Sequence, residues 1–176
     1  MVGIVLLGVI TLVIFRSVTS DDKKDSTAAN LPSICGRISD AELNRLIGPH
    51  GPALQNSTPS TSRCEWRPSP NDEITFLSIE VQHPGDVKAQ DGPRRATERY
   101  DSLLGGWHPE TAQELPGVGN RASLTSSNSK RNPGARIVAT KGEYVALVWY
   151  QKKGATPEPP TSTVQRITET LLAGLP

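Results

Sequence analysis

The sequence lacks the motifs that accompany the commoner catalytic and cofactor sites. It contains no G-x-S-x-G nucleophile elbow, no H-E-x-x-H zinc motif, no phosphate-binding loop and no Asp-rich calcium loop. Histidine is scarce, and His50, His83 and His108 each adjoin a proline or a glycine, so we expect them in surface turns. Their spacing does not demand a metal ion. The sequence therefore predicts a protein without enzyme activity, cofactor or metal.

The chain also lacks a large charge of either sign. Its 176 residues carry a formal net charge of +1. The basic pairs Arg94-Arg95, Lys130-Arg131 and Lys152-Lys153 lie far apart and are mixed with acidic residues. Because a protein that follows a phosphate backbone needs contiguous positive charge, we expect no nucleic-acid partner. The 35% of hydrophobic residues is low but sufficient for the core of one folded domain.

The longest apolar run lies at the amino end, from Val2 to Phe15. As a helix it would span roughly 21 Å, short of the roughly 30 Å of a bilayer's hydrocarbon layer. This length fits either a short membrane anchor or a signal-peptide core. We therefore assign residues 1–16 to an anchor or signal segment that contacts the membrane through residues 2–15. A buried core helix is the alternative, disfavoured because the run has no polar face.

The orientation of this segment rests on two opposing signals. Arg16, Lys23 and Lys24 follow the apolar run, and the positive-inside tendency would keep that flank in the cytoplasm. These charges are few, and the two cysteines favour export. We expect a single-pass protein of the cell membrane whose C-terminal domain is extracytoplasmic. Secretion after cleavage near Val18–Ser20 is the alternative.

Cysteine occurs only twice, as Cys35 and Cys64. A nucleophilic cysteine needs a histidine partner, and a metal site needs more cysteines or histidines at short spacing. An exported chain with two cysteines most simply pairs them. A disulfide closing this loop contributes on the order of 3.5 kcal/mol in the chain-entropy model. We predict the bond, with two unpaired structural thiols as the alternative.

Beyond the apolar run, residues 17–33 are polar and aperiodic, which is typical of a flexible tether, and residues 34–176 are the folded domain. Three helices are expected, at 38–49, 91–104 and 162–174, with capping boxes at Ser39/Glu42 and Ser162/Gln165. Strands are expected at 64–66, 74–81 and 121–126, followed by a hairpin around Lys141-Gly142. The order is helix-strand-strand-helix-strand-strand-strand-helix.

This order predicts an α+β domain. It would hold an antiparallel sheet of about five strands with helices packed on one face, preceded by the N-terminal hydrophobic helix. The segment between the first helix and Cys64 is expected to be a loop. Aromatic residues make up only 5% of the chain, so most of them are expected in the core. Trp107, beside Gly105-Gly106, is the exception and a candidate for partner contact, together with the Gly117, Gly119 and Asn120 loop.

Three segments carry a resemblance to a known family. The stretches SICGRISDAELNRLIG, RCEW and LPGVGNRAS, the last leading to IVATKGEYVALVWY, resemble a family of small secreted actinobacterial proteins. These relatives are mostly lipoproteins or membrane-anchored envelope proteins. The resemblance implies an α+β domain in the cell envelope and supplies no catalytic residues. The lipid-attachment cysteine of many relatives is missing here, which favours direct anchoring or secretion over lipidation.

Together these features predict a membrane-tethered extracytoplasmic domain that binds a ligand or serves as an accessory module of the bacterial envelope. Its partner would be an envelope protein or a small molecule. An envelope hydrolase using His108 with Glu110 or Asp101 is one alternative, although acid–base catalysis needs positioned partners that no motif identifies. A sensory or chaperone-like subunit of a membrane complex is the other.

Overall fold

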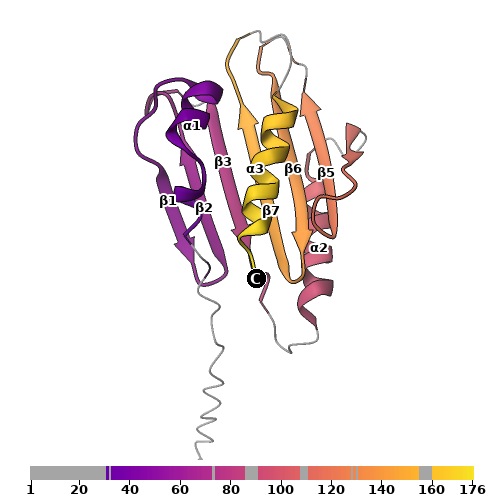
Figure 1. Cartoon of the computed structure of the whole chain (residues 1–176). Helices are drawn as coiled ribbons and strands as arrows, with labels where there is room; N and C mark the ends of the chain where they lie inside the picture. Colours follow the sequence, from indigo (N-terminus) through magenta and orange to yellow (C-terminus); the bar gives the residue numbers. More distant parts are fainter. Residues whose placement is uncertain are drawn as a thin grey trace, which may run out of the picture.

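A computed structural model describes residues 31, 33–72, 74–85, 91–107, 111–127, 129, 131–154 and 160–176. These residues form an α+β domain built on one antiparallel sheet of seven strands in the order β1-β2-β3-β7-β6-β5-β4 (Figure 1). The strands are β1 (Leu54–Thr58), β2 (Thr61–Trp66), β3 (Phe76–Gln82), β4 (Gln113–Glu114), β5 (Arg121–Ser127), β6 (Gly134–Lys141) and β7 (Tyr144–Gln151). The helices are the short 3-10 helix η1 (Cys35–Arg37), α1 (Asp40–Ile47), α2 (Gly92–Gly105) and α3 (Thr161–Ala173).

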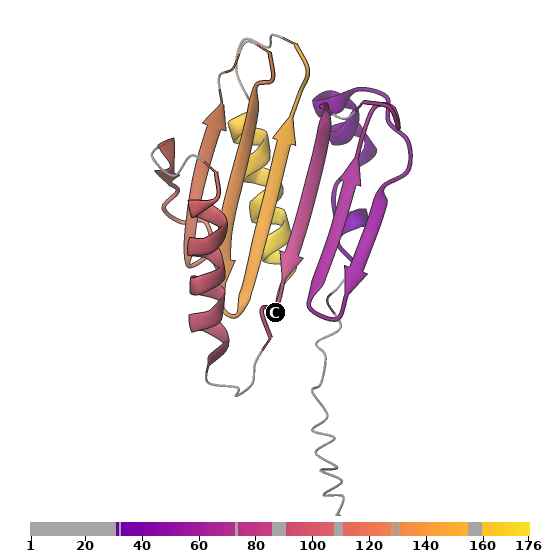
Figure 2. The same ribbon diagram turned by 180° about the vertical axis from the view of Figure 1, so that it is seen from behind.

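The helices cover both faces of the sheet, so the expectation of one covered face was wrong. Figure 1 shows α1 and α3 in front of the sheet, and Figure 2 shows α2 on the opposite face. Apolar residues on both faces of β7 require this arrangement. Tyr144, Ala146 and Val148 pack in the core under α1 and α3, whereas Val145 packs with Tyr100 of α2 in a second, smaller core.

Two of the seven strands, β1 and β4, were not expected, which corrects the prediction of about five. All five residues of β1 are exposed, and β4 is two exposed residues long. Neither segment shows the apolar alternation by which a strand is recognised. Each lies at an edge of the sheet and is held there by backbone pairing to β2 or β5. Edge strands with polar side chains are the usual protection against edge-to-edge association.

One of the two predicted capping boxes is present. The Ser39 hydroxyl accepts a hydrogen bond from the Glu42 N–H at the start of α1, as expected. Helix α3 instead begins after Pro160 without a side-chain cap, so the Ser162/Gln165 box was wrong. The Gln165 amide donates to Glu169 one turn later. Proline just before the first helical residue already restricts the backbone there, which reduces the need for a side-chain cap.

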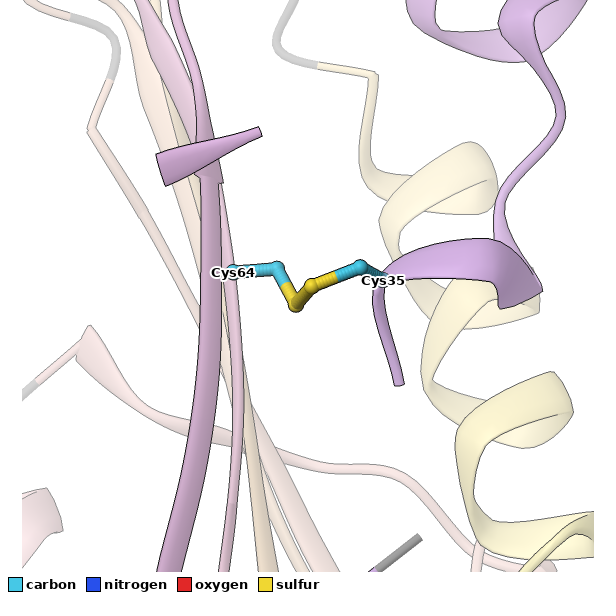
Figure 3. Close-up of a disulfide and its surroundings, with 2 residues drawn as sticks. All are labelled: Cys35 and Cys64. Carbon is cyan, nitrogen blue, oxygen red and sulfur yellow. A yellow bond between two sulfur atoms is a disulfide. The ribbon is translucent and has the colours of Figure 1, made fainter. Parts of the chain in front are cut away.

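The predicted disulfide joins Cys35 to Cys64, with 5.5 Å between the two Cα atoms (Figure 3). It ties η1 to the middle of β2. Trp66 faces the same side of β2 as Cys64, and both belong to the core beneath α1 and α3. The bond therefore fixes the N-terminal end of the domain to β2, the strand next to the edge strand β1.

The N-terminal segments of the sequence are not among the residues that the structure describes. The expected hydrophobic helix, the anchor at 1–16 and most of the tether at 17–33 lie outside the described residues. Within the described ranges, no helix has the length and apolar character needed to cross a bilayer.

Candidate functional site

One half of the sheet face that carries α2 has no helix over it. Helix α2 packs against β6 and β7, and the described residues place no helix on that face above β1, β2 and β3 (Figure 2). We call this area the uncovered face. It carries side chains from alternate positions of β2 and β3, including Arg63, Glu65 and Glu80. Such polar residues on a half-covered antiparallel sheet are those that meet solvent or a partner.

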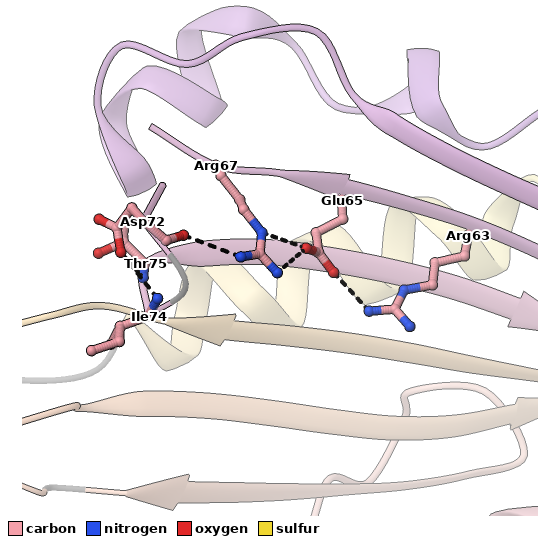
Figure 4. Close-up of polar contacts among 6 residues, drawn as sticks. All are labelled: Arg63, Glu65, Arg67, Asp72, Ile74 and Thr75. Atoms are coloured by element: carbon pink, nitrogen blue, oxygen red, sulfur yellow. Dashed lines mark hydrogen bonds and ion pairs between the residues drawn. The ribbon is translucent and has the colours of Figure 1, made fainter. Parts of the chain in front are cut away.

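A carboxylate between two arginines lies on the β2 part of this face. Glu65 is only 8% exposed, and its two oxygens accept from Arg63 at 2.7 Å and from Arg67 at 2.6 Å (Figure 4). Arg67 also donates to the backbone carbonyl of Asp72 at 3.2 Å. A carboxylate of such low exposure requires these charge-assisted bonds to offset its lost hydration. Glu65 thus holds both arginines in fixed positions.

Aromatic rings continue this arrangement across β3 and β7. The Phe76 and Trp149 centroids are 4.8 Å apart in an edge-to-face contact, and the Trp107 and Trp149 centroids are 5.8 Å apart. The guanidinium of Arg67 lies 5.9 Å from the Phe76 centroid, and that of Arg136 lies 5.5 Å from the Trp107 centroid. Both distances are within the range of cation–π attraction. We call these five side chains the aromatic–arginine row.

Within the described structure, two nitrogen atoms of this row are buried without a hydrogen-bond partner: Nε of Arg136 and Nε1 of Trp149. The residues are register partners in the β6–β7 pair, so their side chains leave the same face side by side. Burial lowers the pKa of the Arg136 guanidinium, and the nearby charge of Arg99 lowers it further, while Glu80 opposes both. No acidic side chain forms an ion pair with Arg136 in the described part of the chain.

A second polar cluster lies along β3 beside α2. Gln82 donates to Glu80 and accepts from Nε of Arg99 at 2.6 Å. His83 follows, with its Nε2 atom 3.2 Å from a Glu143 carboxylate oxygen. Because the Gln82 amide bonds to both Glu80 and Arg99, it connects the three polar side chains of this cluster.

Of the predicted contact residues, Trp107 belongs to the aromatic–arginine row and the glycine loop does not. Gly117 and Gly119 have φ angles of 84° and 63°, and a Cβ on Gly119 would overlap the Thr140 carbonyl oxygen. The Asn120 N–H donates to that carbonyl at 2.7 Å, and its side-chain oxygen accepts from the Gly142 N–H at 2.7 Å. The loop therefore anchors the β6–β7 turn.

The glycine loop also borders a shallow hollow of about 410 Å³ between the loop and the end of α3. Its lining adds Lys141, Glu169 and Leu172 to the loop residues. On β6, Thr140 contacts the loop and Arg136 contacts Trp107. Thr140 and Arg136 are four residues apart, which is roughly 13 Å along a strand. The structure thus separates the predicted contact residues into two places.

Of the three residues of the hydrolase alternative, the structure describes Asp101 alone. Asp101 is exposed and pairs with Arg121 at 3.2 Å, while His108 and Glu110 lie outside the described residues. His50 is half-buried, and its Nδ1 is 2.9 Å from the Gly51 carbonyl oxygen. The searched, described residues contain no group of three metal-binding side chains.

Sequence reasoning did not identify Arg67, Phe76, Arg136 and Trp149 as site residues. Trp149 was expected in the core with most other aromatic residues, because aromatics are scarce in this chain, and it is in fact half-buried. An available signal was the arginine at position 136, which stands between Ala135 and the apolar residues Ile137 to Ala139 of β6. A charged residue on an inner strand needs a nearby solvated or functional surface.

Comparison of the chain with protein-family models, curated proteins and solved structures finds no match.

Proposed function

We propose that this protein is an exported, membrane-tethered binding domain of the bacterial envelope, without catalytic activity, which docks an acidic partner protein on its uncovered face. The single observation that carries this proposal is the aromatic–arginine row, which runs from Arg67 and Phe76 on the uncovered face to Trp149 on β7 and Arg136 on β6, beside the end of α2. Tryptophan and arginine are enriched among the residues that dominate binding energies at protein interfaces. Here both types lie in one row.

Charge favours an acidic partner. Among the described residues on and beside this face, Arg63, Arg67, Arg99 and Arg136 stand against Glu65 and Glu80, an excess of two positive charges in a chain whose net charge is +1. Opposite charge across an interface accelerates encounter and rejects partners of the wrong sign. At the edge of the same face, Leu54 is 64% exposed, the only large hydrophobic so exposed among the described residues. It supplies an apolar contact beside the arginines.

Export is supported by the disulfide between Cys35 and Cys64. Disulfides persist in oxidising compartments and are rare in the bacterial cytosol. Export is tested by fusing the C-terminus to a phosphatase that is active only outside the cytoplasm. If the domain is exported, intact cells should show phosphatase activity. N-terminal sequencing of the mature protein separates the two anchoring modes: retention of residues 2–15 supports the tether, and a chain beginning near Asp21 identifies a secreted form.

The docking surface is tested by photo-crosslinking in the native host. A photoreactive phenylalanine derivative replaces Leu54 on the uncovered face, and in a matched control it replaces Thr170, which is exposed on α3 at the opposite face. We expect a discrete adduct from position 54, its loss when Arg67 is also changed to Gln, and none from position 170. Equal adducts from both positions, or none at position 54, would contradict the proposal.

A further inference from the structure

Two unpartnered hydrogen-bond donors lie next to one another in the aromatic–arginine row. Nε of Arg136 and Nε1 of Trp149 are both buried, both carry hydrogen, and belong to register partners on β6 and β7. Side chains of such partners start about 5 Å apart on the same face. A single acceptor group of two oxygens placed between them has the right size to bond to both donors.

In the described part of the chain, these donors have aromatic rings as neighbours and no hydrogen-bond acceptor. Trp149 meets Phe76 edge-to-face, and the Arg136 guanidinium lies over Trp107. A ring face is a much weaker acceptor than an oxygen atom. A buried donor without an oxygen partner costs about 1–3 kcal/mol, and two adjacent ones in a native structure call for a physical reason.

The charge at this position is also unbalanced. Arg136 has no ion-pair partner among the described residues, and Glu80, whose charge acts on it, is already hydrogen-bonded to Gln82. Arg99 adds a second positive charge nearby. An oxyanion beside a partly desolvated guanidinium would neutralise its charge and replace the stabilisation by water that burial removed.

Trp107 lies over both residues and its attachment permits movement. It follows Gly105 and Gly106, which are exposed and end α2. Among the described residues, a Cβ on Gly105 would meet nothing within 4 Å, and one on Gly106 would first meet the Ser102 carbonyl oxygen at 3.7 Å. Two glycines allow large backbone rotations at this point. Movement of the indole would open Arg136 and Trp149 to a ligand without disturbing the sheet.

We propose that Arg136 and Trp149, beneath Trp107, form a binding site for one oxyanion, a carboxylate or phosphate group. The inference rests on the proposed docking function, because this group would be the part of the acidic partner that enters the row. Arg136 neutralises the charge and donates from its guanidinium, Trp149 donates from its indole N–H, and Trp107 covers the bound group.

The site is tested by anion titration of the purified full chain in detergent, at constant ionic strength maintained with sodium chloride. The chain has three tryptophans, each of which gives one indole N–H signal in a ¹H–¹⁵N correlation spectrum. The Trp149→Phe variant assigns the signal of Trp149. On addition of acetate or phosphate we expect a saturable downfield shift of that signal and no shift for Trp66, which is buried on the opposite face.

Two variants and a control connect the shift to the proposed groups. Arg136→Gln should weaken binding tenfold or more, in keeping with loss of a charge-assisted hydrogen bond. Trp149→Phe, which keeps a ring and removes the donor, should weaken binding several-fold as measured by tryptophan fluorescence, so the test survives if Arg136→Gln fails to fold. Arg45→Gln, on α1 at the other face, should bind as the unaltered protein does.

The outcomes separate this inference from the docking proposal. No saturable shift with any oxyanion, or equal affinity in Arg136→Gln and Arg45→Gln, overturns the oxyanion site, even if position 54 crosslinks to a partner. Loss of the crosslink with a retained anion response overturns the docking proposal alone. A poly-glutamate peptide is compared with acetate, per carboxylate. Tighter binding of the peptide indicates that the site takes an oxyanion of a polymeric partner. Equal affinity indicates that the site takes a free small anion, which supports the site but not its occupation by a group of the partner protein.

Discussion

The ammonium group of Lys141 lies 2.7 Å from the carbonyl oxygen of Leu175 and 3.0 Å from that of Leu172. The β6–β7 hairpin thereby holds the C-terminal end of α3, where carbonyl groups lack partners within the helix. Arg37 contributes a further bond of 3.3 Å to the carbonyl of Gly174. Two cations at a helix C-terminus also complement its dipole.

Lys141→Met should lower the free energy of unfolding by about 1–2 kcal/mol, since it removes charge-assisted hydrogen bonds from part-buried carbonyls. Urea denaturation followed by circular dichroism measures the loss. Lys152→Met is the control, because only the backbone N–H of Lys152 forms a hydrogen bond within the described structure. Equal losses in the two variants would show that the contact with α3 contributes nothing.

Removal of the disulfide should have a larger effect. The Cys35→Ala/Cys64→Ala double variant should lose about 3.5 kcal/mol of unfolding free energy, because the closed loop no longer restricts the unfolded chain. Denaturation of the unaltered protein with and without a thiol reductant provides the comparison. Reductant should bring the unaltered protein close to the double variant and leave that variant unchanged.

Asp72 should make stability depend on acid pH. Its carboxylate accepts from the N–H groups of Thr75 at 2.8 Å and Ile74 at 3.0 Å (Figure 4). These bonds, that of Thr75 first, lower the pKa of Asp72 in the folded protein, although burial opposes them. A carboxyl group with a lowered folded-state pKa stabilises the protein above its unfolded pKa of about 3.9, and that contribution is lost as pH falls through the folded value.

Asp72→Asn should therefore be less stable than the unaltered protein by about 1 kcal/mol at pH 6, with the difference shrinking as pH falls below 4. Urea midpoints measured from pH 6 to pH 2.5 test this trend. Asp101→Asn, at an exposed ion pair with Arg121, is the matched control and should change stability little at either end. A difference that is constant across the range would assign the effect of Asp72 to something other than its charge.

Two glycines near the β6–β7 turn distinguish backbone strain from steric overlap. Gly119 and Gly142 have φ angles of 63° and 55°, but a Cβ would collide only at Gly119, with the Thr140 carbonyl. Gly142→Ala should cost about 1 kcal/mol from its left-handed backbone alone. Gly119→Ala should cost more, since the backbone at Thr140 must also move. Thermal denaturation of the two variants side by side gives the order, and equal losses would contradict the collision.

Local sequence patterns were sufficient for the elements that bury an apolar face. The Ser39 cap, the three helices and strands β2, β3, β5, β6 and β7 each have their own apolar periodicity or capping residue, and each is present. Strand β1 has no such signal, because its position comes from backbone bonds to β2. The local pattern was also insufficient at the N-terminus of α3, where Pro160 stands at the cap position in place of the expected Ser162 cap.

The site was less accessible to sequence reasoning. Trp107 could be singled out from its neighbours Gly105 and Gly106, and Trp149 appeared to be an ordinary core residue. Their contact depends on where α2 ends over the sheet, and residues 42 positions apart in the chain cannot be paired from spacing alone. For the glycine loop the sequence signal was clear but its interpretation as a contact site was not supported, because the loop is hydrogen-bonded to the β6–β7 turn.

The sequence by itself determined the class of domain and the pairing of Cys35 with Cys64, because periodicity, capping and cysteine count act through local chemistry. Only the tertiary structure decided that α2 lies on the opposite face from α1 and α3. That placement leaves part of the sheet uncovered and brings Trp107 to Arg136 and Trp149. The physical reason is that a helix chooses its face by packing against distant strands, and its own sequence specifies only that it has an apolar side.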